Sequence, residues 1–101
     1  MLRTLFGMGP KVDLKELKAN GAMILDVRTK EEFASGHVKG SVNIPLDKLQ
    51  KEMHKLPKGK PVIACCLSGG RSGSAVSMLK AEGIDAYNGG GWASLNSVLK
   101  G

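Results

Sequence analysis

The 101-residue chain has few of the features that define several large protein classes. Aromatic residues make up 4% of it, so aliphatic side chains, methionine and alanine have to fill the core. No apolar stretch approaches the roughly 18 residues of a membrane-spanning helix, so we expect no membrane span. Residues 1–10 are interrupted by glycine and lack the apolar centre of a secretion signal, and we expect a tail or an edge element there.

Cysteine is scarce, and its placement is informative. Cys65 and Cys66 are neighbours, so they cannot cross-link distant parts of the chain, and a vicinal disulfide would be strained. There is no Cys-x-x-Cys pair, and neither His37 nor His54 has metal-ligand spacing to a cysteine, which argues against a zinc site. Cysteine usage of this kind predicts a reducing compartment such as the cytoplasm.

Acidic residues are the minority among the charged ones. Fifteen Lys and Arg against nine Asp and Glu give a net charge of +6, and ten of the twelve lysines are spaced out within residues 11–60. A solvated basic surface explains this pattern, and a field that attracts small anions is the functional alternative. The sequence lacks the basic runs, interleaved aromatics and zinc-finger spacing of nucleic-acid binding, so we expect no nucleic-acid partner.

The sequence does contain a regular alternation of helix and strand patterns. Capping residues predict helices that begin at Asp13, Thr29 and Asp47, and apolar periodicity predicts two more over residues 72–82 and from residue 92 onward. Short apolar runs predict strands at residues 23–25, 42–44, 61–65 and 84–87, with residues 11–12 as a further edge strand. This alternation predicts one α/β domain over residues 11–101, a parallel sheet with helices on both faces.

One strand-to-helix connection has unusual chemistry. Ligands of parallel α/β sheets bind beyond the carboxyl ends of the strands, and two glycines in a short loop let successive N–H groups converge on one anion. The start of the next helix adds free N–H groups and the positive end of its dipole. We therefore predict that Cys66 is a nucleophile with a lowered thiol pKa, and that Arg71 closes the ring. We expect the backbone N–H groups of this loop to form the cradle that binds the anion, and its residues are Leu67, Ser68, Gly69, Gly70 and Ser72.

These residues also have structural interpretations. Cys66 could be a small core residue, although the Gly-Gly-Arg context favours the nucleophile, and Cys65 is expected on the opposite, buried face of the strand. Arg71 could bind an anionic donor or tie the loop to the sheet. Asp26 and Arg28 follow the first strand, and they could border the same pocket or form an ion pair or cap that holds the turn, which we favour.

The chain resembles the rhodanese family. Residues 24–28, 31–33 and 36–45 resemble its first conserved block, residues 66–72 its active-site loop, and residues 87–91 its closing glycine motif. The matches occur in the family's order and cover roughly residues 11–95. The resemblance implies a parallel five-stranded sheet flanked by helices, and a single-domain sulfurtransferase that needs no cofactor and no metal.

The resemblance also implies a reaction. Cys66 would attack the outer sulfur of a donor such as thiosulfate, a polysulfide or a persulfide, hold the sulfur as a persulfide, and pass it to a thiol, cyanide or a protein cysteine. Leu67 stands where some thiosulfate-using members have a basic residue, which favours a neutral, polymeric or protein-bound donor. Leu95 stands where the family commonly has a second aromatic, while Trp92 comes earlier.

Two other functions share such a loop. A slow or non-catalytic sulfur carrier acting on protein partners would use the same Cys66. A cysteine phosphatase or arsenate reductase related to the rhodanese fold would place five residues between Cys and Arg, whereas here there are four, Leu67 to Gly70. One residue fewer removes up to about 3.5 Å of contour, so a sulfur atom fits more readily than a phosphoryl group.

Overall fold

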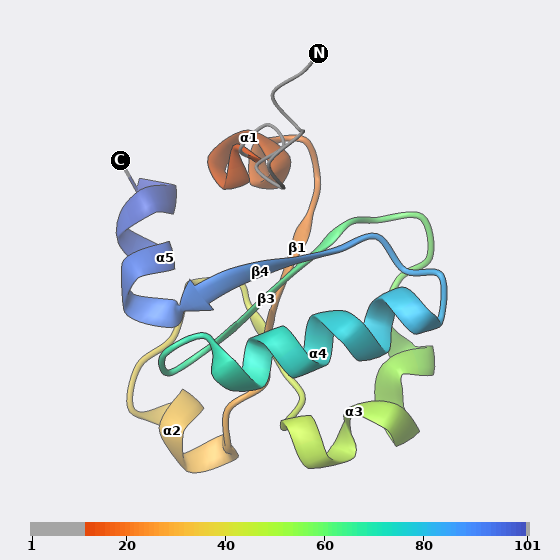
Figure 1. The fold of residues 1–101 in the computed structure, drawn as a ribbon. Helices are drawn as coiled ribbons and strands as arrows, with labels where there is room; N and C mark the ends of the chain where they lie inside the picture. Colours follow the sequence, from red (N-terminus) through yellow and green to blue (C-terminus); the bar gives the residue numbers. More distant parts are fainter. Residues whose placement is uncertain (1–11, 101) are drawn as a thin grey trace, which may run out of the picture.

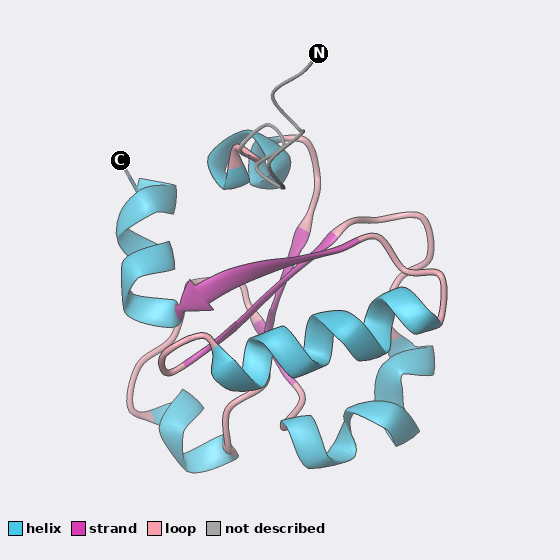
Figure 2. Ribbon diagram, viewed as in Figure 1, coloured by secondary structure: helices cyan, strands magenta, loops and turns pink. Residues whose placement is uncertain are grey.

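The computed structural model describes residues 12–100, in which four strands form one parallel sheet with the order β2-β1-β3-β4 (Figures 1 and 2). The strands are β1 (Met23–Asp26), β2 (Val42–Asn43), β3 (Val62–Cys66) and β4 (Ala86–Gly91). The helices are α1 (Leu14–Ala19), α2 (Lys30–Ala34), α3 (Leu46–Glu52), the 3₁₀ helix η2 (Met53–Lys55), α4 (Gly70–Ala81) and α5 (Trp92–Lys100). The predicted α/β fold with a parallel sheet is confirmed.

The number of strands is a correction. Within residues 12–100 the sheet has four strands, and the prediction of a five-stranded sheet was wrong. Val12 is irregular and 50% exposed, because it directly precedes the cap residue of α1 and leads into that helix instead of pairing with a strand. Lys11 lies outside the described residues, as does the tail or edge element predicted at residues 1–10.

Local capping fixes the first two helices as predicted. The Asp13 side chain accepts the Glu16 N–H at 3.1 Å, which satisfies a free donor at the start of α1. Thr29 and Glu32 form a complete capping box at the start of α2, in which each side chain accepts the backbone N–H of the other. A helix as short as α2 depends on such a cap, since a few residues cannot sustain a helix by propensity.

Three elements start two residues away from the predicted position. The cap at Asp47 was wrong: α3 begins at Leu46 after Pro45, whose fixed φ suits a helix start, and Asp47 lies in the first turn. Helix α4 begins at residue 70, before the predicted residue 72. Strand β4 begins at residue 86 and not at 84, because the Ile84 N–H bonds to the carbonyl of Leu79 and closes the end of α4.

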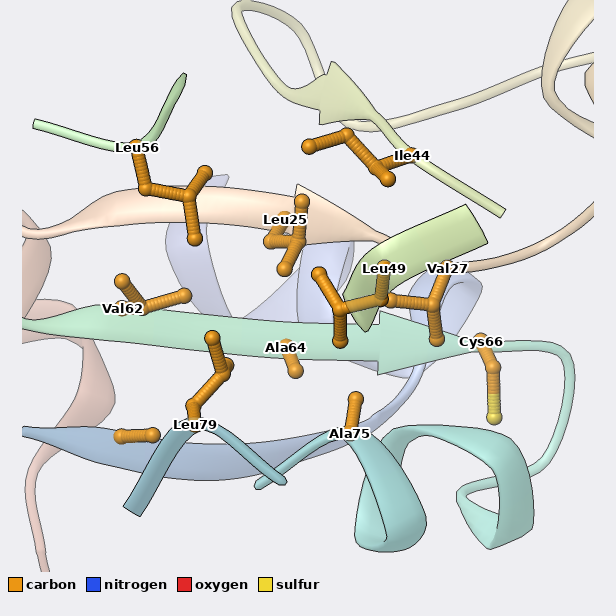
Figure 3. Packing of buried hydrophobic residues seen from close by; sticks show 11 residues of the cluster. Leu25, Val27, Ile44, Leu49, Leu56, Val62, Ala64, Cys66, Ala75 and Leu79 are labelled. Carbon is orange, nitrogen blue, oxygen red and sulfur yellow. The ribbon is translucent and has the colours of Figure 1, made fainter. Parts of the chain in front are cut away.

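The sheet separates two apolar layers, so helices cover both of its faces as predicted. Alternating side chains of β3 divide between them, with Cys66 in one layer and Cys65 in the other, which confirms that the two cysteines face opposite ways. The first layer lies against α3 and α4 and is drawn in Figure 3. The second lies against α1 and α5. No helix within residues 12–100 is long and apolar enough to span a bilayer.

The carboxyl ends of the strands meet at one edge of the sheet. Asp26 of β1 is in register with Asn43 of β2 and with Cys65 of β3, and Cys66 is in register with Gly91 of β4. The parallel pairing therefore places the ends of β1 and β4 beside the connection that follows Cys66, at the edge where α/β sheets bind ligands.

Candidate active site

Cys66 is the last residue of β3, and the chain after it folds back over its sulfur atom. Sγ accepts the N–H of Gly69 at 3.0 Å and the N–H of Ser72 at 3.3 Å, and it lies 3.4 Å from Ser72 Oγ. Gly69 has a φ of +105°, a left-handed conformation that favours glycine and turns its N–H toward the sulfur. Figure 3 shows the sulfur directed toward the first turn of α4. The loop thus surrounds Sγ with hydrogen-bond donors.

These donors decide the charge of the thiol. Burial raises the pKa of Cys66, but hydrogen bonds from the Ser72 hydroxyl and from the N–H groups of Ser72, Gly69 and Ser68 outweigh it and lower the pKa below its ordinary value. At Cys65, burial and the charge of Asp26 raise the pKa to about 12. Of the two neighbouring thiols, Cys66 is therefore the one with the lower pKa and the one that ionises more readily.

The sulfur of Cys66 is enclosed. The residue is 1% exposed, whereas Leu67 is 60% exposed, and Ser68 and Gly70 also face solvent. A reactant therefore has to reach Sγ through or beside this loop. The enclosure favours a partner that offers a single narrow atom, or a larger partner that displaces the loop.

Arg71 is paired with helix α2. Its two terminal nitrogens donate to Oε1 and Oε2 of Glu32 at 2.7 and 3.1 Å. Of the two roles considered for Arg71, this geometry corresponds to tying the loop down, with α2 as the partner instead of the sheet. The hydrogen bond from Arg71 and the Thr29 N–H hold the pKa of Glu32 down at about 2, so the pair is charged throughout the neutral range.

Asp26 and Arg28 form a buried ion pair. Arg28 Nε lies 2.9 and 3.1 Å from the two Asp26 oxygens, its Nη2 lies 2.7 Å from Oδ2, and the side chains are 0% and 2% exposed. The guanidinium also donates to the carbonyls of Glu32 and Gly36 and lies 4.8 Å from the centre of the Trp92 ring. The favoured ion-pair interpretation fits this geometry. A pocket rim does not, because both side chains are buried.

Strand β4 completes the site with residues that sequence reasoning missed. Asn88 Oδ1 accepts the Ser72 hydroxyl at 2.7 Å, and Asn88 Nδ2 donates to the carbonyl of Gly69 at 3.2 Å. A Cβ on Gly91 would lie 2.7 Å from the carbonyl oxygen of Leu67, so this close approach requires glycine. The available signal was the glycine run of β4, which indicates another backbone nearby but does not say which.

Within the described residues, no group of three or more His, Cys, Asp or Glu side chains is arranged to hold a metal ion. The chemistry of the site as it stands rests on one thiol, the N–H groups around it and the Ser72 hydroxyl. Such a set can stabilise an anionic sulfur and accept negative charge that develops on it.

Comparison with known proteins shows which family the chain is similar to. A family model described as "Rhodanese-like domain" matches residues 11–97. The chain is 33% identical over 70 residues to the thiosulfate sulfurtransferase GlpE of Ectopseudomonas mendocina, covering 69% of this chain and 64% of GlpE. It is 38% identical over 61 residues to the putative sulfur carrier protein YrkF of Bacillus subtilis, covering 60% of this chain and 33% of YrkF. The chain thus spans about two thirds or less of these curated relatives.

A solved structure shows the same fold. The crystal structure of a rhodanese-related protein from Thermoplasma volcanium superposes with a TM-score of 0.75 at 31% identity, covering 84% of this chain and 85% of that one. The family model spans most of the chain, and its range includes the loop around Cys66. The chain belongs to the rhodanese-like domain family.

Proposed function

We propose that this protein is a sulfurtransferase in which Cys66 carries sulfane sulfur as a persulfide. The observation that supports this most directly is the shell of donors around Sγ, which lowers the pKa of Cys66 despite its burial. The relative GlpE is named a thiosulfate sulfurtransferase. Donors that hold a thiolate in place can also stabilise the charge that develops on sulfur during transfer.

The reaction has two half-reactions. The Cys66 thiolate attacks the outer sulfur of the donor, a new S–S bond forms, and the donor's bond to that sulfur breaks, so the remainder leaves with the electron pair. A thiol, as its thiolate, or cyanide then attacks the outer sulfur of the persulfide, and Cys66 departs as a thiolate. Electrons balance within each exchange, so no external oxidant or reductant enters, and the kinetics are ping-pong.

The donor we favour is a polysulfide or a protein-bound persulfide over thiosulfate. Arg71 is the single cation in residues 66–72, and its charge is neutralised by Glu32. A compact dianion such as thiosulfate would have to compete with that carboxylate for the guanidinium. A protein-bound persulfide carries at most one charge, and a polysulfide carries its charges on its terminal atoms, so both can present sulfur to the loop without a cation beside it. Leu67, exposed at the start of the loop, offers such a donor an apolar contact. We expect a higher kcat/KM with polysulfide than with thiosulfate.

The decisive experiment is intact mass spectrometry after exposure to polysulfide or thiosulfate. Wild type and Cys65→Ser should each gain one sulfur, about 32 Da, and a thiol should remove it. Cys66→Ser should gain none. A gain that survives in Cys66→Ser, or the absence of any gain in wild type with either donor, would refute the proposal.

A second candidate is a sulfur carrier that exchanges sulfur with a partner protein. It is favoured by the enclosure of Cys66, which is 1% exposed, because a protein surface can open the loop more readily than a small molecule. The relative YrkF is named a putative sulfur carrier. Slow turnover with small donors together with fast exchange with a persulfidated protein would select this role.

Location of the protein in the cytoplasm stays a prediction.

The phosphatase alternative has no support in the site geometry. Arg71 is bound to Glu32, and a phosphoryl group would need that guanidinium on its own oxygens. Turnover of a phosphate ester at a rate comparable to sulfur transfer would favour the phosphatase over the sulfurtransferase.

A further inference from the structure

The Ser72 hydroxyl lies between two acceptors. Ser72 is fully buried, and its Oγ is 2.7 Å from Asn88 Oδ1 and 3.4 Å from Cys66 Sγ. Asn88 Oδ1 also accepts the Gly90 N–H at 2.9 Å, while Asn88 Nδ2 donates to the Gly69 carbonyl. These two bonds fix the orientation of the amide, so the atom facing Ser72 is an oxygen that can only accept.

A serine hydroxyl has one proton to donate, so it serves one acceptor at a time. While Cys66 is a thiol, its S–H donates to Ser72 Oγ, and the Ser72 proton goes to Asn88. Once Cys66 is a thiolate, the sulfur has no proton and faces the Ser72 oxygen lone pairs unless the hydroxyl turns toward it. Asn88 Oδ1 keeps its bond from Gly90 in either state, so the turn leaves no acceptor of Asn88 unpaired.

We propose that the Ser72 hydroxyl is a switchable donor controlled by Asn88: its proton lies on Asn88 while Cys66 is a thiol and turns to Sγ when Cys66 is an anion. Asn88 is thus a positioning residue that acts on the sulfur through Ser72. During the proposed sulfur transfer, on which this extension rests, the switch would add a donor whenever Sγ carries charge. The hydroxyl would return to Asn88 when Sγ is bonded to a second sulfur.

Other titratable groups belong to the elements packed around Cys66. Among them are Cys65 on β3, Asp26 on β1, Arg28 after β1, Glu32 on α2, Asp47 on α3, Arg71 on α4 and Tyr87 on β4, and α2, α3 and α4 also carry Lys30, Glu31, Lys48, Lys51, Glu52 and Lys80. Two ion pairs are among them, Asp26 with Arg28 and Glu32 with Arg71, and the members of each pair are hydrogen-bonded to each other. Substitutions at residues 72 and 88 leave all these charges in place. The effects of the charges on the Cys66 pKa therefore cancel when the four proteins are compared.

The test is a double-mutant cycle on the thiol pKa of Cys66. All four proteins carry Cys65→Ala, so that Cys66 is the one remaining cysteine. They are this background alone, with Ser72→Ala, with Asn88→Ala, and with both. The rate of alkylation by iodoacetamide is followed against pH by intact mass, which reports the pKa without any sulfur donor.

The cycle isolates the switch. Ser72→Ala should raise the pKa, because the anion loses a donor. Asn88→Ala removes the acceptor that competes with Sγ for the Ser72 proton. In the background that retains Ser72, it should therefore lower the Cys66 pKa by about half to one unit more than it does in the Ser72→Ala background. Any loosening of the Gly69 carbonyl acts in both backgrounds and cancels. An effect of Asn88→Ala that is equal in the two backgrounds, or of opposite sign, would overturn the proposal.

A second variant covers the case in which Asn88→Ala does not fold. Asn88→Asp preserves the shape and presents a carboxylate, which holds the Ser72 proton more strongly, so it should raise the pKa more when Ser72 is present than in the Ser72→Ala background. Equal shifts would again overturn the switch. The test of the switch is separate from the test of the proposed function. Coupling between residues 72 and 88 without persulfide formation would support the switch and refute the sulfurtransferase. Persulfide formation without coupling would support the sulfurtransferase and refute the switch.

Discussion

Gly91 is the point at which β4 contacts the loop around Cys66, and a methyl group there should raise the pKa of the Cys66 thiol while the sheet stays folded. A Cβ at this position would lie 2.7 Å from the carbonyl oxygen of Leu67, closer than real Cβ contacts come. The opposing atom belongs to the backbone and cannot rotate away. Loop and strand must therefore separate by about 0.7 Å to restore an ordinary contact of 3.4 Å.

The expected magnitude follows from the neighbouring hydrogen bond. Gly69 N lies 3.0 Å from Sγ, and a displacement of about 0.7 Å would stretch and weaken this hydrogen bond. A hydrogen bond to a charged group contributes about 1.5–3 kcal/mol, and one pKa unit corresponds to about 1.4 kcal/mol. We expect the Cys66 pKa to rise by about one unit in Gly91→Ala. At pH values well below the wild-type pKa of Cys66, alkylation should then be about ten times slower than in wild type.

Gly89→Ala is the matched control in the same strand. Its Cβ would lie 2.8 Å from Ile63 Cγ2 and 3.0 Å from Leu95 Cδ2, so the same added methyl strains the core instead of the loop. Overpacking of this kind costs about 1–3 kcal/mol of stability, which urea unfolding measures in both variants. Only Gly91→Ala should shift the pH profile of Cys66 alkylation. A wild-type profile in folded Gly91→Ala would refute the reasoning.

Two predictions concern the ion pairs. Arg28→Ala leaves the buried Asp26 carboxylate without its partner and should cost about 3–5 kcal/mol in urea unfolding. The double substitution Asp26→Asn with Arg28→Met should cost less, and an equal or larger cost would contradict this account. Because the folded pKa of Glu32 is lowered from 4.5 to about 2, its pair with Arg71 stabilises the fold above pH 4.5, and that contribution is lost as pH falls toward 2. Unfolding midpoints of wild type and Glu32→Gln should therefore converge over this range, and a constant gap would show that the pair does not act on stability.

Much of the fold could be predicted because its signals are local. Thr29 and Glu32 form a capping box within one turn of chain, and the apolar run of β3 has the length and continuity of a strand buried on both faces. The strand count and the start of β4 were missed because both depend on competition between elements. The Ile84 N–H is used to close α4, so the strand starts later than its apolar run.

In the candidate site, too, local contacts could be predicted from the sequence and long-range contacts could not. The position of Cys66 and the N–H groups of Gly69 and Ser72 lie within seven consecutive residues, so spacing alone could place them together. The partner of Arg71 is 39 residues away in the chain, and Asn88 is 16 residues from Ser72. A sequence without its fold does not say which carboxylate or amide meets a given loop, so these contacts could not be predicted.

Helix α2 connects the buried charge pair to the reactive sulfur. Arg28, held by Asp26, donates to the backbone carbonyl of Glu32, while the side chain of the same Glu32 binds Arg71. The cation nearest in sequence to Cys66 is thereby committed to α2, and the donors on Sγ are uncharged N–H groups. Uncharged donors stabilise a thiolate without attracting a dianion from solution, because their field falls off faster than that of a net charge. If the site selects its sulfur donor by charge, Glu32→Gln should therefore raise kcat/KM for thiosulfate while leaving that for polysulfide near its wild-type value, and equal changes for both donors would place the selectivity elsewhere.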